Sequence, residues 1–215
     1  MDLFDFNPVL LKYIEDHTSP EDKVLSDLRR YTYLKVVHPR MLSGPVQGRF
    51  LEIISKLIQP LRILEVGTYT GYSAICLARG LKKEGKLFTI ELNDELEQVH
   101  SKFFAQAGLK DKIVKINGDA RLEIPKLDED FDLIFIDGEK EQYIEYYEAV
   151  LPKTKKGGLI IVDNVLWDGK VIDEQFRKDS STLSIKNFNR LVNWDIRVEN
   201  VVLPLRDGLM LIRKL

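Results

Sequence analysis

Carboxylate side chains follow the short apolar runs of this sequence, at the points where strands would end. They are Glu65, Glu91, Asp119, Asp137 and Asp163, and Asp163 is followed by Asn164. Ligands of open α/β sheets bind outside the carboxyl ends of the strands, so we expect these side chains around one site. Glu91 lies about 20 residues beyond a glycine turn, where nucleotide-binding folds place an acid that accepts both hydroxyls of a ribose.

The glycine turn has the sequence E-V-G-T-Y-T-G-Y-S, residues 65–73, and joins an apolar run to a helical pattern. Gly67 has no Cβ to keep a ligand from the backbone, and the helix start offers unpaired N–H groups. The spacing differs from the G-x-G-x-x-G of dinucleotide-binding turns, and Glu65 would disfavour a pyrophosphate. A nicotinamide-dependent dehydrogenase is therefore disfavoured, whereas an ordinary glycine turn of another α/β protein stays open.

Alternating strand and helix patterns supply the elements that position these residues. Apolar runs predict five parallel strands and then an antiparallel hairpin with an R-D-G turn at residues 206–208. The expected strands are 61–66, 86–92, 113–120, 131–140, 157–167, 198–205 and 209–212. Helices are expected at 8–17, at 20–33 with a start at Ser19, at 94–107 and at 185–193. The stretch 168–184 is expected to be a loop or partial helix.

Composition limits the class of protein. The chain has 215 residues, 44% of them hydrophobic, and a net charge of -2. This length suits a single domain over residues 1–215, with helical additions at 1–58 and a cofactor-binding core at 59–215. The near-neutral charge provides no general attraction to nucleic acid or to an anionic membrane. No apolar stretch approaches the roughly 20 residues of a membrane span. The N-terminus is acidic, whereas a signal peptide would be basic. The single cysteine, Cys76, is expected in the core, and a chain without a disulfide framework favours an intracellular setting. We therefore expect a cytoplasmic protein.

Several motifs together resemble one family. They are M-L-S-G-P-V-Q-G, E-V-G-T-Y-T-G-Y-S, G-D-A, F-I-D-G-E-K, V-D-N-V-L-W and L-P-L-R-D-G-L, in this order from Arg40 to the C-terminus. The set resembles the cation-dependent class I S-adenosylmethionine O-methyltransferases, which include catechol and caffeoyl-coenzyme A O-methyltransferases and bacterial relatives. The resemblance implies a Rossmann-like α/β fold. Its mostly parallel seven-stranded sheet would have helices on both faces and an antiparallel C-terminal hairpin.

The resemblance also implies which residues bind S-adenosylmethionine. Glu65 would face the positively charged amino-acid end of the cofactor, the Ser73 hydroxyl its carboxylate, and Glu91 the ribose hydroxyls. Asp119 and Ala120 would lie on the adenine side. The full set is Ser43, Glu65, Gly67, Thr68, Tyr69, Ser73, Glu91, Asp119, Ala120, Asp137 and Glu139. Glu139 departs from the aspartate that is common in the plant enzymes.

The family's metal ligands correspond to Asp137, Asp163 and Asn164. Three oxygen donors without histidine or cysteine favour a hard divalent cation, Mg²⁺ first, with Ca²⁺ or Mn²⁺ as alternatives. Lys140 corresponds to the general base and would act beside Asp137. A lysine is ordinarily protonated at neutral pH, so its surroundings would have to lower its pKa.

The implied reaction is methyl transfer to a hydroxyl of a catechol-like or other small molecule. Two alternatives stay open: methylation of a hydroxyl on a modified tRNA base, and a binding module that holds the cofactor without turnover. Basic residues that could contact tRNA are Arg29, Arg30, Lys153, Lys155 and Lys156. The N-terminal helices lie outside the minimal methyltransferase unit, and relatives are often dimers, so we expect a homodimer. The substrate itself is not identified by any motif.

Overall fold

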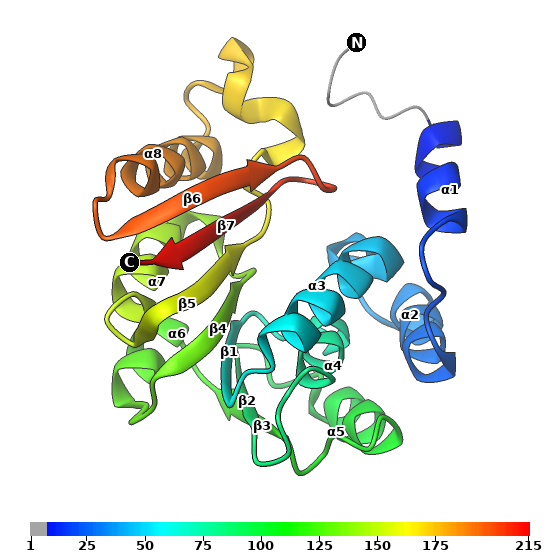
Figure 1. Cartoon of the computed structure of the whole chain (residues 1–215). Helices are drawn as coiled ribbons and strands as arrows, with labels where there is room; N and C mark the ends of the chain where they lie inside the picture. The colour runs from blue at the N-terminus through cyan, green and yellow to red at the C-terminus, as the bar shows by residue number, and fades with distance from the viewer. Residues whose placement is uncertain (1–7) are drawn as a thin grey trace.

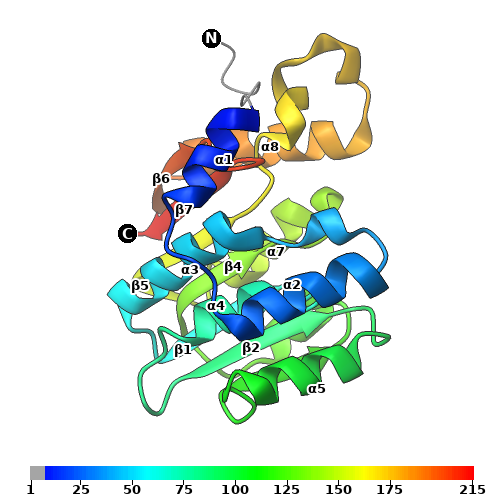
Figure 2. The same cartoon turned by 90° about the vertical axis from the view of Figure 1, so that its right-hand side faces the viewer.

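A seven-stranded sheet with helices on both faces organises the computed structural model, which describes residues 8–215 (Figures 1 and 2). The strand order is β3-β2-β1-β4-β5-β7-β6. Strand β7 runs antiparallel to both β5 and β6, while the remaining pairs are parallel. The strands are β1 (Arg62–Val66), β2 (Lys86–Glu91), β3 (Ile113–Asn117), β4 (Phe131–Ile136), β5 (Thr154–Val162), β6 (Val198–Leu203) and β7 (Leu209–Lys214). The predicted fold class, including the C-terminal antiparallel hairpin, is confirmed.

Alternate side chains of each strand enter two hydrophobic cores, as the period of two requires. On β4, Leu133 and Phe135 belong to one core, and Ile134 and Ile136 belong to the other. Figure 1 shows the corresponding helices on opposite faces of the sheet. The first face carries α2 (Lys23–Lys35), α3 (Gly44–Ile58), α4 (Tyr72–Ala78) and α5 (Glu97–Gln106), and the second α6 (Ala120–Glu123), α7 (Tyr143–Val150) and α8 (Ser180–Trp194).

The N-terminal helices differ in how they pack. Helix α2 buries Leu25 and Leu28 in the first core, whereas α1 (Pro8–Asp16) has no buried residue. The predicted start of α2 at Ser19 was wrong. Asp22 is the N-cap instead, because its side chain accepts a 3.0 Å hydrogen bond from the Leu25 N–H.

Other boundaries also differ from the prediction. The strands expected at 131–140 and 157–167 end earlier, at Ile136 and Val162. At two further boundaries an aspartate again caps a helix. Strand β3 ends at Asn117, and Asp119 caps α6 through the Arg121 N–H. Helix α8 begins at Ser180 rather than Ile185, since Asp179 accepts a hydrogen bond from the Thr182 N–H. Short 3₁₀ helices complete the chain: η1 (Pro39–Met41), η2 (Ile124–Lys126), η3 (Lys140–Gln142), η4 (Trp167–Ile172) and η5 (Glu174–Phe176).

Cys76 lies in α4 as a free, fully buried thiol, and burial raises its pKa. The prediction of a core role for this cysteine is therefore confirmed. None of the helices formed by residues 8–215 is both long and apolar enough to cross a bilayer.

Candidate active site

Glu65 is fully buried on β1, directly opposite Thr89 of β2. The Thr89 hydroxyl donates a 2.5 Å hydrogen bond to Glu65 Oε2, whereas Oε1 is buried and has no partner among the described residues. Burial raises the pKa of Glu65 to about 8, although the polar side chains of Ser73 and Thr89 oppose the shift. A buried carboxylate is costly unless a cation or donors satisfy it, so this position suits a cationic group of a ligand.

Gly67 is held between the ends of β2 and β4. Its N–H donates a 3.0 Å hydrogen bond to the Ile90 carbonyl, and its φ of +94° lies in the left-handed region. A Cβ at this position would stand 2.1 Å from the backbone carbonyl oxygen of Asp137. The sequence predicted that a ligand would approach the backbone where Gly67 lacks a Cβ, but the backbone of Asp137 occupies that space. The glycine turn and Asp137 therefore belong to one site.

Tyr69 and Glu91 connect the glycine turn to its surroundings. The Tyr69 N–H donates a 2.8 Å hydrogen bond to Glu91 Oε2, and the Asn93 N–H donates a 2.9 Å bond to Oε1. The Tyr69 hydroxyl donates to the Val37 and His38 carbonyls at 2.9 and 3.2 Å. The segment after α2 is thus tied to the turn, and Glu91 is held at the end of β2, where the sequence predicted the ribose acid.

Lys140 forms an ion pair with Asp137. Lys140 Nζ lies 2.9 Å from Asp137 Oδ1, 3.0 Å from the Gly138 carbonyl and 5.2 Å from the centre of the Tyr143 ring. Burial lowers the pKa of Lys140, but the negative charge of Asp137, followed by the effect of Tyr143, outweighs burial and leaves the pKa raised. Lys140 can act as a base only when another group balances the charge of Asp137.

Asp163 follows β5 and is buried beside α3. Gln47 Nε2 donates a 2.6 Å hydrogen bond to Asp163 Oδ2, and the Asn164 N–H donates a 2.7 Å bond to Oδ1. Burial, followed by the negative charge of Asp137, raises the pKa of Asp163. The buried carboxylate of Asp163 and the partly buried carboxylate of Asp137 repel each other, so a cation between them would be favoured.

Asn164 has a left-handed backbone, with φ of 58°. Its Nδ2 donates a 3.0 Å hydrogen bond to Asp207 Oδ2, which leaves the amide oxygen as the free acceptor. Within residues 8–215, no three His, Cys, Asp or Glu side chains gather in a metal-binding arrangement. Asp137 and Asp163 supply two carboxylates, and proteins commonly hold Mg²⁺ with one or two carboxylates together with water. The donor chemistry therefore fits a hard cation.

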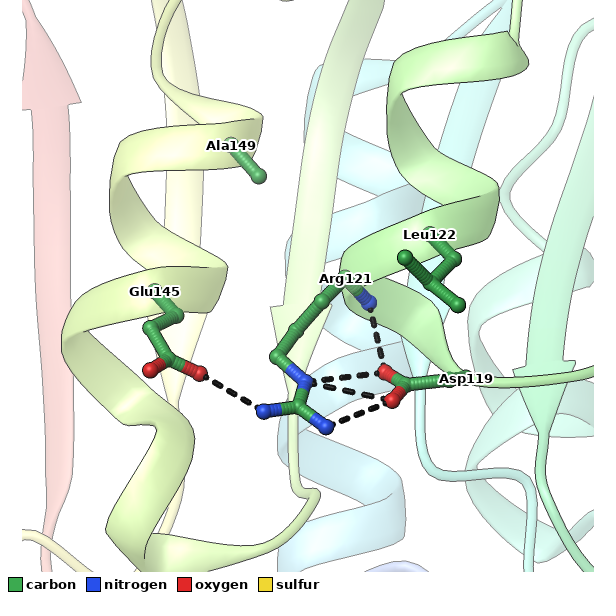
Figure 3. A pocket seen from close by; sticks show the side chains of 5 residues that line it. All are labelled: Asp119, Arg121, Leu122, Glu145 and Ala149. Carbon is green, nitrogen blue, oxygen red and sulfur yellow. Dashed lines mark hydrogen bonds and ion pairs between the residues drawn. The ribbon is translucent and has the colours of Figure 1, made fainter.

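Asp119 lies at a surface cavity of about 410 Å³ between α6 and α7 (Figure 3). Arg121 Nη2 donates a 2.6 Å hydrogen bond to Asp119 Oδ2, and Arg121 Nη1 lies 3.2 Å from Glu145 Oε2. The hydrogen bonds from Arg121 lower the pKa of Asp119. Ala120 is buried at the start of α6. Binding of adenine by this pair stays a prediction.

The other predicted cofactor residues, Ser43, Thr68, Ser73 and Glu139, come from separate parts of the chain. Ser43 and Ser73 are buried, the first immediately before α3 and the second in α4. Thr68 is also buried, and its hydroxyl oxygen lies 2.5 Å from that of Thr89. Glu139 caps η3 by accepting a 3.1 Å hydrogen bond from the Lys140 N–H.

Sequence reasoning missed the polar residues that hold the site together. Gln47 and Arg206 lie within quoted motifs but were assigned no role, and Thr89 was treated only as part of a strand. A threonine between Phe88 and Ile90 in an otherwise apolar strand was the available signal. Gln47 contacts Asp163 across a separation of 116 residues, which no local pattern reveals.

Comparisons with known proteins place this chain among characterised sequences. A family model described as O-methyltransferase matches residues 15–215. A catechol O-methyltransferase of Niastella koreensis is 34% identical over 197 residues, covering 90% of this chain and 88% of its own. A caffeoyl-CoA O-methyltransferase of Populus kitakamiensis is 34% identical over 209 residues, covering 91% and 88%.

Solved structures resemble the whole chain. An O-methyltransferase from Bacillus cereus in complex with SAH has a TM-score of 0.87 and 29% identity, with 95% of this chain and 96% of that chain covered. The O-methyltransferase TomG from Streptomyces achromogenes in complex with SAM has a TM-score of 0.88 and 28% identity, with 100% and 99% covered.

Proposed function

Because this chain belongs to the O-methyltransferase family, we propose that it transfers a methyl group from S-adenosylmethionine to one hydroxyl of a catechol-like small molecule, with a divalent cation held by Asp137, Asp163 and Asn164. Similarity to catechol and caffeoyl-CoA O-methyltransferases over most of the chain supports this substrate class. The single observation that carries the proposal is the contact between Gly67 and the Asp137 backbone, which places the glycine turn against Asp137 of the proposed cation site.

Glu65 would hold the amino-acid part of the cofactor, and Glu91 would hold its nucleoside part. The unpartnered Oε1 of Glu65 is an acceptor for the amino group, and Glu91, fixed by two backbone N–H groups, keeps acceptor capacity for the ribose hydroxyls. Buried Ser73 would donate its hydroxyl to the carboxylate. These three side chains would orient the cofactor, and none of them is a proposed metal ligand.

When bound, S-adenosylmethionine supplies an electrophilic methyl group, and a cation supplies charge that lowers the pKa of a substrate hydroxyl. Asp137 and Asp163 provide the negative charge that would bind such a cation, and Mg²⁺ is the preferred candidate. Balancing the charge of Asp137 would weaken its hold on Lys140 Nζ and lower the Lys140 pKa. Lys140 could then accept the proton of the substrate hydroxyl.

Three of the five basic residues considered for tRNA already have partners within the chain, which weakens that alternative. Arg29 is paired with Glu21, Lys155 is paired with Asp132, and Lys153 donates to the Leu127 carbonyl. Engaged cations neutralise fewer phosphates than free ones. We therefore retain a small-molecule substrate.

The experiment that tests the proposed function follows the labelled methyl group of S-adenosylmethionine. Purified protein with Mg²⁺ is offered catechol, an acyl-coenzyme A phenol, and undermodified tRNA in separate reactions. We expect label on one hydroxyl of a phenolic diol. Label on tRNA alone would replace the small-molecule assignment, and binding of the cofactor without transfer to any acceptor would favour a non-catalytic module.

We also propose a homodimer. Helix α1 has no buried residue, and its side chains Leu10, Leu11 and Tyr13 are exposed. An amphipathic helix with a solvated apolar side is stabilised when a second surface covers it. A second copy of this chain is the simplest such surface.

A further inference from the structure

The turn between β6 and β7 connects two walls of the site. It spans residues 204–208, and Arg206 within it has a left-handed backbone with φ of 51°. A strained backbone at a non-glycine residue persists where surrounding contacts hold it. The turn's backbone carbonyls accept hydrogen bonds from the segment after Asn164: the Val165 N–H donates to Gly208 and the Leu166 N–H to Asp207.

Arg206 reaches across to the loop before α3. Its guanidinium donates to the carbonyls of Leu42, at 2.9 Å, and of Ser43, and also contacts Gln47 Oε1 at 3.2 Å. Gln47 Oε1 therefore accepts a hydrogen bond from Arg206, and Gln47 Nε2 donates one to Asp163. Because both ends of the amide have partners, its orientation is fixed with the donor toward Asp163.

Asp207 reaches to the other wall. Its Oδ2 accepts from Asn164 Nδ2 at 3.0 Å, and its Oδ1 accepts from the Asp168 N–H. An ionised carboxylate accepts hydrogen bonds and cannot donate them. Asp207 therefore selects the amide orientation in which the NH₂ of Asn164 faces it. The amide oxygen of Asn164 is thereby left for another partner.

We propose that Arg206 and Asp207 are positioning residues of the active site. Arg206 acts through Gln47 on Asp163 and through the backbone on Ser43, whereas Asp207 acts through Asn164. This assignment rests on the proposed function, because Ser43 belongs to the proposed cofactor site and Asp163 and Asn164 to the proposed cation site. Residues that orient metal ligands without touching the metal typically change its affinity by about 10- to 100-fold.

Asp207→Asn tests the metal half of the assignment. The amide of Asp207→Asn has one oxygen, which cannot accept from both Asn164 Nδ2 and the Asp168 N–H. If this oxygen stays on the Asp168 N–H, the new NH₂ faces Asn164, and the Asn164 amide must turn its own oxygen toward it. We expect Mn²⁺ affinity, measured from the electron paramagnetic resonance signal of free Mn²⁺, to fall by about 10- to 100-fold. The affinity for S-adenosylhomocysteine, measured by calorimetry, should stay within about threefold of wild type, a difference near 0.6 kcal/mol.

A double-mutant cycle separates positioning from general damage. If Asp207 acts through Asn164, Asn164→Ala and the double variant with Asp207→Asn should bind Mn²⁺ equally weakly. Losses that add in the double variant would contradict the assignment. If wild-type protein binds Mn²⁺ and the Asp207→Asn variant binds it with equal affinity, the positioning role of Asp207 is refuted but the metal site is not. Wild-type protein that binds neither Mn²⁺ nor Mg²⁺ would refute the proposed metal site, and the assignment of Asp207 with it.

Arg206→Lys tests the other half, because lysine keeps the charge but lacks the planar fork of donors. We expect weaker binding of both S-adenosylhomocysteine and Mn²⁺, each by roughly tenfold, which is one lost hydrogen bond of about 1.4 kcal/mol. Arg213→Ala is the matched control, since this arginine lies on the same hairpin and pairs with exposed Glu199. Unchanged binding in Arg206→Lys, or an equal loss in Arg213→Ala, would overturn the assignment of Arg206. Equal melting temperatures and circular dichroism spectra establish that the variants are folded.

Discussion

The carbonyl oxygen of Asp137 occupies the space where a Cβ of residue 67 would be, at a separation of 2.1 Å. The end of β1 and the end of β4 therefore approach each other as closely as a glycine allows. This contact places the glycine turn against the Asp137–Lys140 ion pair, so the residues proposed for the cofactor and for proton transfer share one location. The same contact defines a direct test.

Gly67→Ala should be strongly destabilising and should abolish S-adenosylhomocysteine binding, because the new methyl group would overlap the backbone of Asp137. Gly108→Ala is the matched control. Gly108 also has a positive φ, of 68°, but a Cβ there would meet nothing within 4 Å. Backbone strain alone costs about 1–2 kcal/mol, so urea unfolding should show a loss of that size at Gly108 and a clearly larger loss at Gly67. Equal losses at the two positions would contradict the proposed contact.

Glu65 should make the cofactor-free protein less stable as the pH rises. Its pKa is about 8 in the folded state and 4.5 in the unfolded state, so the folded state binds this proton more tightly. The resulting stability is fully present below pH 4.5 and is lost as the pH rises through about 8. Urea unfolding over this range should show a smaller decline in the free energy of unfolding for Glu65→Gln than for wild type. The exposed Glu95→Gln variant should decline like wild type.

The same Glu65→Gln variant should bind S-adenosylhomocysteine more weakly by roughly 10- to 100-fold, since a charge-assisted hydrogen bond to the amino group is lost. Calorimetry at neutral pH should also detect a proton released when wild type binds, because the bound amino group favours the ionised carboxylate. An unchanged affinity would show that Glu65 does not contact the cofactor.

Lys140→Ala should retain the metal and the cofactor but lose about 10²- to 10⁴-fold in rate, the usual contribution of a general base. Raising the pH should partly restore the rate, because the substrate hydroxyl then ionises without a base. Single-turnover kinetics over a pH series measures both effects. A Lys140→Ala enzyme as fast as wild type would remove Lys140 from the mechanism.

Light scattering at micromolar concentration should give the mass of two chains. Leu11→Glu, on the exposed side of α1, should shift the protein toward the monomer by placing a charge in the interface. Leu122→Glu, at an exposed position of α6, is the matched control and should leave the mass unchanged. A monomeric wild type would contradict the proposed dimer.

The strands could be predicted from sequence because buried parallel strands leave continuous apolar runs, and the acids that follow them mark the binding edge. The helix starts were predicted less well. Asp22, Asp119 and Asp179 each decide a boundary through a side-chain hydrogen bond that competes with more general capping signals.

The candidate residues of the site could be identified from motifs, but their partners could not. Arg206 contacts the loop before α3 across more than 150 positions, and Asp207 orients Asn164 from a turn whose sequence indicates only a hairpin. Such pairings depend on which strands become neighbours. The antiparallel insertion of β7 beside β5 brings this turn to the site.

The most direct test of the central claim is methyl transfer from labelled S-adenosylmethionine to catechol in the presence of a chelator. We predict that excess EDTA abolishes transfer, that added Mg²⁺ restores it, and that S-adenosylhomocysteine binding is largely unchanged throughout. Asp163→Ala should behave as wild type does in EDTA and should not respond to Mg²⁺ at ordinary concentrations. Undiminished transfer in excess EDTA, or full activity of Asp163→Ala, would contradict a cation-dependent O-methyltransferase.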